Sequence, residues 1–240
     1  MSEISYKRIG ESVLLIEWPA EISEENLIRI LNIQHGLNQQ QIEGILEMWP
    51  AYRSLAIHYN PETVSHEQLI LKIDSHKNQD HDLIKPNRWL IPVCYESEYA
   101  LDLLDASKQL KLNPEEVIYR HCAVEYKVHF MGFLPGFMYL GGLDQSINLP
   151  RKPAPKRSVP KGAVAIGGFQ TGIYPSESPG GWHVIGNSPL RFFDVTAENP
   201  CFIQPGDTVR FEAVTHQEYK VSQLETRLDV FDLNAILKNG

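Results

Sequence analysis

The chain has 240 residues, of which 42% are hydrophobic and 22% charged, and its formal charge at pH 7 is −8. This composition is typical of a globular protein with a sizeable core, and it excludes a disordered chain. The net negative charge disfavours nucleic acids and anionic membranes as partners. Because domains usually have about 100–150 residues, we expect two of them.

The N-terminal segment carries no targeting or membrane signal. Its apolar run, Val13 to Ile16, is far shorter than the ~20 residues of a membrane span, so we expect a cytoplasmic protein. The three cysteines, Cys94, Cys122 and Cys201, lie far apart and form no CxxC pair. Neither a disulfide framework nor a metal site is therefore expected.

Residues 1–80 predict a small α/β domain of ferredoxin-like type. A strand at 13–16 is followed by a helix capped by Ser23 and ended by Gly36, and then by strands at 42–48 and 54–59. A capping box at 65–68 opens a second helix. Two helices on one face of a small sheet are an economical packing. The polar segment that follows predicts a linker at 81–88 and a second domain at 89–240.

The second domain begins with a strand at 89–93 and a helix at 101–110. Asn113-Pro114-Glu115-Glu116 predicts another helix, because it combines a cap, a proline at the first position and a capping-box glutamate. Alternation over 123–130 predicts a strand with His129 on its wet face. Short strands are expected at 163–166, 182–185, 190–193, 201–203 and 208–214, with a short terminal helix. This order predicts an α+β protein whose second domain is a sandwich or barrel.

Large aromatic residues stand on segments rich in glycine and proline, such as GFLPGFMYLGG and SPGGWHVIGNSP. Because loops lie at the surface, we interpret these rings as a binding surface that faces water, on a backbone stiffened by glycine and proline. The alternative is that the loops plug the ends of a barrel. The rings concerned are those of Phe133, Phe137, Tyr139, Tyr174 and Trp182.

A basic ridge, LPRKPAPKRSVPKG, lies between the two aromatic segments. It is either solvated loop charge or a docking site for a carboxylate, a phosphate or an acidic partner, for which arginine is better suited than lysine. No GxSxG, HExxH or GxxxxGK[ST] motif is present, so the catalytic residues stay unknown.

Four stretches together resemble the KipI family, also described as the B subunit of 5-oxoprolinase or as allophanate hydrolase subunit 1. They are EYKVHFMGFLPGFMYLGGL, LPRKPAP, VPKGAVAIGGFQTGIYP and SPGGWHVIG, and the resemblance extends to PGDTVRF. It implies a small α/β domain followed by a cyclophilin-like β-barrel. It also implies that this chain acts together with the A and C subunits in the ATP-dependent opening of 5-oxoproline to glutamate. ATP would be used by the complex, and no cofactor would be tightly bound to this chain. The KipI name implies a second role, inhibition of a sporulation sensor histidine kinase through its dimerisation and phosphotransfer region.

The resemblance also marks the positions expected to bind substrate or partner. Arg151 is assigned to an anionic group and Gln170 to hydrogen bonding, while the aromatic rings enclose apolar surface. Lys156 and Ala163 stand where many relatives carry arginine and serine, which weakens the enzymatic half of the interpretation. The rival is a pure kinase inhibitor; prolyl isomerase activity would rest on fold analogy alone. The full set of expected site residues is His121, Glu125, Tyr126, Phe133, Pro135, Gly136, Phe137, Tyr139, Arg151, Gln170, Thr171, Tyr174, Pro175, Gly180, Gly181 and Trp182.

Overall fold

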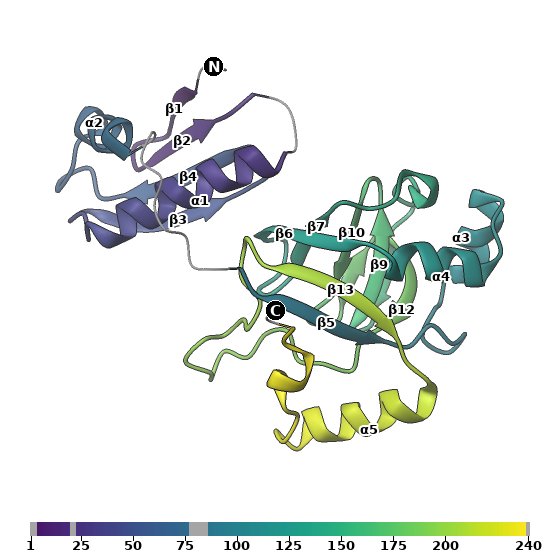
Figure 1. Ribbon diagram of the computed structural model, residues 1–240. Helices are drawn as coiled ribbons and strands as arrows, with labels where there is room; N and C mark the ends of the chain where they lie inside the picture. The colour runs from purple at the N-terminus through teal and green to yellow at the C-terminus, as the bar shows by residue number, and fades with distance from the viewer. Residues whose placement is uncertain (1–3, 20–22, 77–85, 239–240) are drawn as a thin grey trace. The chain divides into compact units, whose positions relative to one another are not determined.

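The computed structural model describes residues 4–19, 23–76 and 86–238 (Figure 1). The chain forms two compact units, Met1–Pro86 and Asn87–Gly240, and each has its own sheet and core. Most of the expected linker, 81–88, lies outside the described residues, so its bounds stay a prediction. The two units are described separately below.

The first unit is one antiparallel sheet with two helices. Its strand order, β1-β2-β4-β3, is that of a ferredoxin-like sheet whose last position is filled by the first strand of the chain. That first strand was not expected from the sequence. The elements are β1 (Ser5–Ile9), β2 (Val13–Glu17), α1 (Glu24–Gln39), β3 (Ile45–Pro50), β4 (Ser54–Tyr59) and α2 (His66–His76).

Helix α1 begins where the sequence predicts and ends later. The side chain of Ser23 accepts a hydrogen bond from the Asn26 N–H at 3.2 Å, and two glutamates occupy the first turn. Gly36, the expected stop, is instead a buried helical residue, and the helix continues to Gln39. Strand β3 accordingly starts three residues later than expected.

The second unit contains a seven-stranded sheet with the order β12-β9-β10-β7-β6-β13-β5, and a separate pair, β11-β8. Cys94, just after β5, and Asn187, at the end of β12, exchange main-chain hydrogen bonds of 2.9 and 3.0 Å. These bonds join the two ends of the sheet into a nearly closed barrel, which confirms the predicted α+β class. The elements are β5 (Arg88–Val93), α3 (Leu103–Leu110), α4 (Pro114–Cys122), β6 (Glu125–Met131), β7 (Met138–Gly141), η1 (Gln145–Ile147), β8 (Lys156–Val159), β9 (Ala163–Gly167), β10 (Gln170–Ile173), β11 (Ser178–Gly180), β12 (His183–Asn187), β13 (Thr208–Ala213), α5 (His216–Arg227) and η2 (Leu233–Ile236).

Some expected strands of the barrel are not formed, and others were missed. Residues 190–193 and 201–203 are irregular, although Leu190, Phe192 and Ile203 are buried in the barrel core. Their apolar character reflects burial and not strand pairing. Strands β7, β8 and β10 and helix α5 were not expected, even though Thr215 and Glu218 form a capping box at the start of α5.

The alternation predicted along β6 is interrupted. The register against β7 shifts between Val128 and Phe130, as in a β-bulge. His129, expected on a wet face, is buried with 5% of its surface exposed and lies against Gly141, where a Cβ atom would collide with its ring. The bulge therefore turns a polar side chain into the protein.

Candidate functional site

Most of the predicted aromatic surface is buried. Phe137 and Tyr174 are each 2% exposed and Trp182 is 4% exposed, so the prediction that these rings face water is wrong. They form a second small core with edge-to-face geometry, in which Phe137 lies 5.1 Å from Tyr174 and 5.5 Å from Trp182 between ring centroids.

The glycines of these segments make room for the rings. A Cβ on Gly167 would lie 2.5 Å from the Trp182 indole, and one on Gly172 would lie 3.2 Å from it. A Cβ on Gly180 would collide with the Tyr174 ring. The glycines are therefore packing positions on strands, where a ring covers the bare backbone.

One ring of the predicted surface does face water. Phe133 is 61% exposed and its backbone is left-handed, with φ of 68°, in the loop between β6 and β7. Its ring touches the buried core edge-on, 5.6 Å from Phe137. Pro135 is also exposed, Tyr139 is half-buried, and Gly136 has a φ of 81° that suits glycine. A bulky residue held at positive φ is strained and is often found at binding sites.

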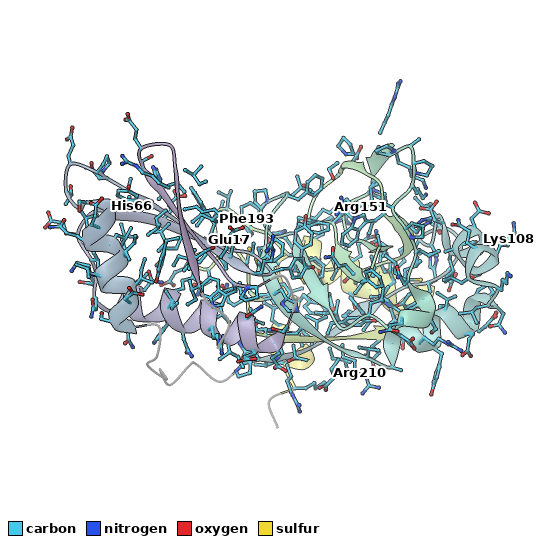
Figure 2. The ribbon with its side chains drawn as sticks, turned by 90° about the horizontal axis from the view of Figure 1, so that it is seen from above. Glu17, His66, Lys108, Arg151, Phe193 and Arg210 are labelled. Atoms are coloured by element: carbon cyan, nitrogen blue, oxygen red, sulfur yellow. The ribbon has the colours of Figure 1, made fainter. Side chains whose placement is uncertain are left out.

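The basic ridge is anchored to one buried carboxylate. Asp102, just before α3, is 6% exposed, and its Oδ1 lies 2.5 Å from Lys152 Nζ and 2.9 Å from Lys156 Nζ. Arg151 (labelled in Figure 2) is exposed and its guanidinium lies 5.7 Å from the centroid of the Trp182 indole. Two lysines thus share one carboxylate, which leaves an excess of positive charge.

Asp102 also completes the open edge of β12. Its N–H donates to the Val184 carbonyl at 2.8 Å, and its Oδ2 accepts from the Val184 N–H at 2.9 Å. Burial by itself would raise the pKa of Asp102, but hydrogen bonds from Lys152, Lys156 and the Val184 N–H outweigh it and lower the pKa. The carboxylate is therefore charged at neutral pH and holds the ridge in place.

A cavity of about 200 Å³ opens beside this cluster, between α3 and the start of the ridge. His183, only 4% exposed, forms part of its wall, and its Nε2 donates to the Pro150 carbonyl at 3.0 Å. Two cations, Arg151 and Lys152, and two carboxylates, Asp102 and Asp105, line the cavity, so a small anion would bind on the side of Arg151. Its lining residues are Asp102, Asp105, Gln109, Pro150, Arg151, Lys152, Pro153 and His183.

Three expected site residues lie inside the barrel instead. His121 is fully buried; its Nδ1 lies 2.8 Å from the Tyr95 hydroxyl and its Nε2 lies 2.9 Å from the Thr171 hydroxyl. The Tyr126 hydroxyl donates to the His121 carbonyl at 2.8 Å. Burial lowers the pKa of His121 to about 3, so the imidazole is neutral. These groups form a structural polar network away from the charged cavity.

The remaining expected residues are dispersed. Glu125 is exposed on β6, with its Oε2 3.5 Å from Arg88 Nη2, and Gln170 is half-buried at the start of β10. Pro175 is buried beyond the end of β10. Gly181 lies beside the ridge, because its carbonyl accepts from the Lys152 N–H at 2.8 Å. The sequence therefore located Arg151 and its surroundings but missed Asp102 and His183.

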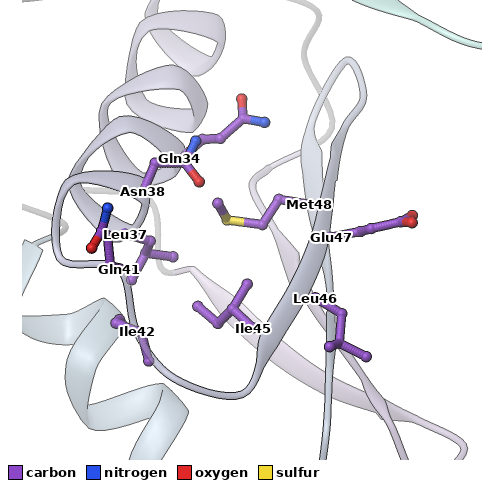
Figure 3. A pocket seen from close by; sticks show the side chains of 9 residues that line it. All are labelled: Gln34, Leu37, Asn38, Gln41, Ile42, Ile45, Leu46, Glu47 and Met48. Carbon is purple, nitrogen blue, oxygen red and sulfur yellow. The ribbon is translucent and has the colours of Figure 1, made fainter.

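A larger cavity, of about 510 Å³, lies in the first unit between α1 and β3 (Figure 3). The nine residues that line it include one carboxylate, that of Glu47, and no cationic side chain. It therefore does not suit an anionic ligand.

Residues 4–19, 23–76 and 86–238 contain no cluster of three histidine, cysteine or acidic side chains that could hold a metal ion. Within the same ranges, no helix has the length and apolar character needed to cross a membrane. Cys94, Cys122 and Cys201 are free.

The chain belongs to the family described as carboxyltransferase domain, subdomain C and D, which matches residues 4–203. Within that family it is similar to the B subunit of 5-oxoprolinase. It is 34% identical to that protein from Bacillus subtilis over 92% of this chain and 97% of the relative, and 35% identical to that from Haemophilus influenzae over 85% and 94%.

A solved structure supports the fold. TTHA0988 superposes with a TM-score of 0.77 at 35% identity, over 85% of this chain. This chain spans 40% of the length of that protein. The motifs led us to expect the Bacillus KipI protein itself, but at 34% identity the chain is a relative of the Bacillus subtilis protein and not the same protein.

Proposed function

We propose that the chain is the B subunit of an ATP-dependent 5-oxoprolinase, which opens 5-oxoproline to glutamate together with the A and C subunits. The observation that carries this proposal is the similarity to the 5-oxoprolinase B subunits of two bacteria, at 34–35% identity over nearly their whole length. The enzyme is a hydrolase, and ATP is used by the assembled complex.

The cavity beside Asp102 is the proposed site for the substrate carboxylate. Arg151 lines it, and its guanidinium has no carboxylate partner among the described residues, while Lys152 contributes a second cation. A planar guanidinium binds a carboxylate with two parallel hydrogen bonds. The cavity volume of about 200 Å³ is enough for a small ring compound.

This chain is proposed to position and shield the substrate and not to attack it. His121 does not line the cavity, and it is neutral and bonded at both ring nitrogens, so it has no free nitrogen for proton transfer. His183 does line the cavity, and its Nε2–H is engaged by the Pro150 carbonyl. The reacting groups are therefore assigned to the partner proteins of the complex, which agrees with the absence of nucleophile motifs in the sequence.

Co-expression with the A and C subunits tests the proposal. The complex is expected to hydrolyse 5-oxoproline only with ATP and only with this chain present. Arg151→Gln is expected to raise KM about tenfold or more, because a charge-assisted hydrogen bond contributes about 1.5–3 kcal/mol. Arg157→Gln, an exposed change on the same ridge, is the matched control. Equal hydrolysis without this chain would refute the proposal.

A second candidate is inhibition of a sporulation sensor histidine kinase, favoured by the exposed and strained Phe133. A rigid aromatic ring that projects from a barrel is a typical anchor of a protein interface. Phe133→Asn tolerates the left-handed backbone and removes the ring, so it is expected to abolish kinase binding and leave 5-oxoprolinase activity intact. Calorimetry with the kinase dimerisation domain measures this; undiminished binding would place the interface elsewhere.

A further inference from the structure

The first unit has a groove, lined by both polar and apolar side chains, that the proposed activity does not use. We call it the β3 groove; it is the cavity of about 510 Å³ bounded by the C-terminal half of α1 and by β3. Figure 3 shows Ile45 and Met48 pointing toward α1, whereas Leu46 and Glu47 point away from it. The full lining is Gln34, Leu37, Asn38, Gln41, Ile42, Ile45, Leu46, Glu47 and Met48.

Strand β3 is an edge strand, because it lies at one end of the sheet order β1-β2-β4-β3. The Ala51 N–H donates to Ser54 and Trp49 pairs with Ala56, so alternate residues face β4. By this alternation the N–H and C=O of Met48 point to the open edge. Such an edge is a template for another extended chain.

The open edge is short. Pro50 occupies the next outward position and has no N–H, and the register shifts between Ile45 and Glu47 as in a bulge. Both features limit pairing to a few residues around Met48. Long, unselective pairing between sheets is thereby prevented, while a short segment still fits.

Both faces of β3 are apolar next to this edge. Leu46 is 57% exposed and Trp49 is 49% exposed on the face away from the groove, where Trp49 stacks on the His58 ring. Ile45 and Met48 are half-buried on the groove face. One added strand would cover both faces at once, because its side chains alternate between them.

The charge around the β3 groove selects the occupant. Glu43 and Glu47 are exposed here, and neither has an ion-pair partner among residues 4–19, 23–76 and 86–238. The last turn of α1 has no basic residue, so the negative end of its dipole is not compensated. The surface of the chain next to the β3 groove is therefore negative.

We propose that the β3 groove binds an extended segment of a partner protein, in which apolar side chains alternate and one neighbouring residue is lysine or arginine. The segment pairs with β3 through Met48, and its basic side chain lies near Glu47, on the face of β3 that points away from α1. This interface is separate from the charged cavity of the second unit and does not depend on the 5-oxoprolinase assignment.

Selection from a random eight-residue phage-displayed library on the immobilised full chain tests this. We expect the enriched peptides to have alternating apolar residues and a lysine or arginine. We expect Met48→Glu to lower the affinity of the chain for the synthetic peptides at least about tenfold, as measured by fluorescence anisotropy. Glu47→Lys should weaken them about two- to fivefold, the range of exposed ion pairs. Leu71→Glu, an equally polar change at an exposed position of α2 outside the groove, should leave the affinity unchanged.

Circular dichroism melts of all variants establish that they are folded. The proposal is overturned if no peptide is enriched, if enriched peptides are acidic, or if they bind Met48→Glu as tightly as the original chain. It is also overturned if light scattering shows a dimer that Met48→Glu dissociates, because the occupant would then be a second copy of the chain.

Discussion

One buried histidine, His121, makes the stability of the second unit depend on pH. His121 is fully buried, stacks on Phe211 at 4.5 Å between ring centroids and is bonded at both ring nitrogens. The perturbation is His121→Gln, whose amide still reaches Thr171 but does not titrate. We expect a baseline loss of about 1 kcal/mol, because the bond to Tyr95 is removed.

The magnitude follows from the pKa of His121, which is about 3 in the folded chain and about 6.5 when unfolded. Between these values only the unfolded state binds the proton, so the free energy of unfolding falls as pH falls. The slope is about 1.4 kcal/mol per pH unit. Lowering the pH from 7 to 5 should therefore cost about 2 kcal/mol through this histidine alone.

The assay is the urea dependence of amide hydrogen exchange in β9 and β10, read by mass spectrometry, which reports on the second unit. Other titrating groups cancel when the original chain is compared with His121→Gln at each pH. We expect the original chain to be about 1 kcal/mol more stable than His121→Gln at pH 7 and about 1 kcal/mol less stable at pH 5, a change of about 2 kcal/mol in the difference. A gap that stays constant within about 0.5 kcal/mol would refute the reasoning.

Three further predictions concern packing, charge and backbone. Gly167→Ala should destabilise the second unit by about 1–3 kcal/mol in urea unfolding, because a Cβ would lie 2.5 Å from the Trp182 ring. Gly181→Ala is the control: its Cβ would have its nearest heavy atom at 3.7 Å, so the loss of stability should be far smaller. Asp102→Asn should cost about 1–3 kcal/mol and raise KM, because it weakens the anchor of the two lysines. Glu115→Gln, an exposed change on α4 outside the cavity, should stay within about 0.5 kcal/mol and leave KM unchanged; equal effects of the two changes would contradict the anchoring role. Lys111→Gly should raise the stability of the second unit by about 1 kcal/mol, because Lys111 ends α3 with a φ of 58°, a left-handed conformation that glycine adopts without strain. An unchanged or lower melting temperature would contradict this prediction.

Signals that act over a few residues were read correctly from the sequence. Ser23 caps α1, and Asn113 caps α4 by accepting from the Glu116 N–H at 2.7 Å. The strands at 13–16 and 54–59 were also found, the first from its short run of four apolar residues. These features depend on neighbours in the chain, which the sequence displays.

The buried rings could not be predicted in the same way. Glycine beside an aromatic residue was interpreted as a loop, but Gly167 and Gly172 lie on strands that leave space for Trp182. The ring and the bare backbone come from different strands, so the pairing exists only after folding. Burial of the rings is therefore a property of the tertiary structure.

The charged site was only half visible for a similar reason. The basic ridge and Arg151 stood out in the sequence, whereas Asp102 is one of many acidic residues and lies about fifty positions earlier. It is the fold of α3 against β12 that brings this carboxylate to Lys152 and Lys156.

The double use of Asp102 has a consequence for the solubility of variants. Asp102 holds the two lysines and also forms two hydrogen bonds with Val184 on β12, one from its main-chain N–H and one to its carboxylate. Replacing its side chain would release the two lysines and leave the Val184 N–H without its acceptor, although the main-chain bond to the Val184 carbonyl would remain. An unpaired N–H at a strand edge is a point at which a neighbouring molecule can pair. Loss of ligand binding and a tendency to self-associate thus depend on the same side chain. Selection against aggregation would therefore preserve this residue even in a protein that no longer needs enzymatic activity.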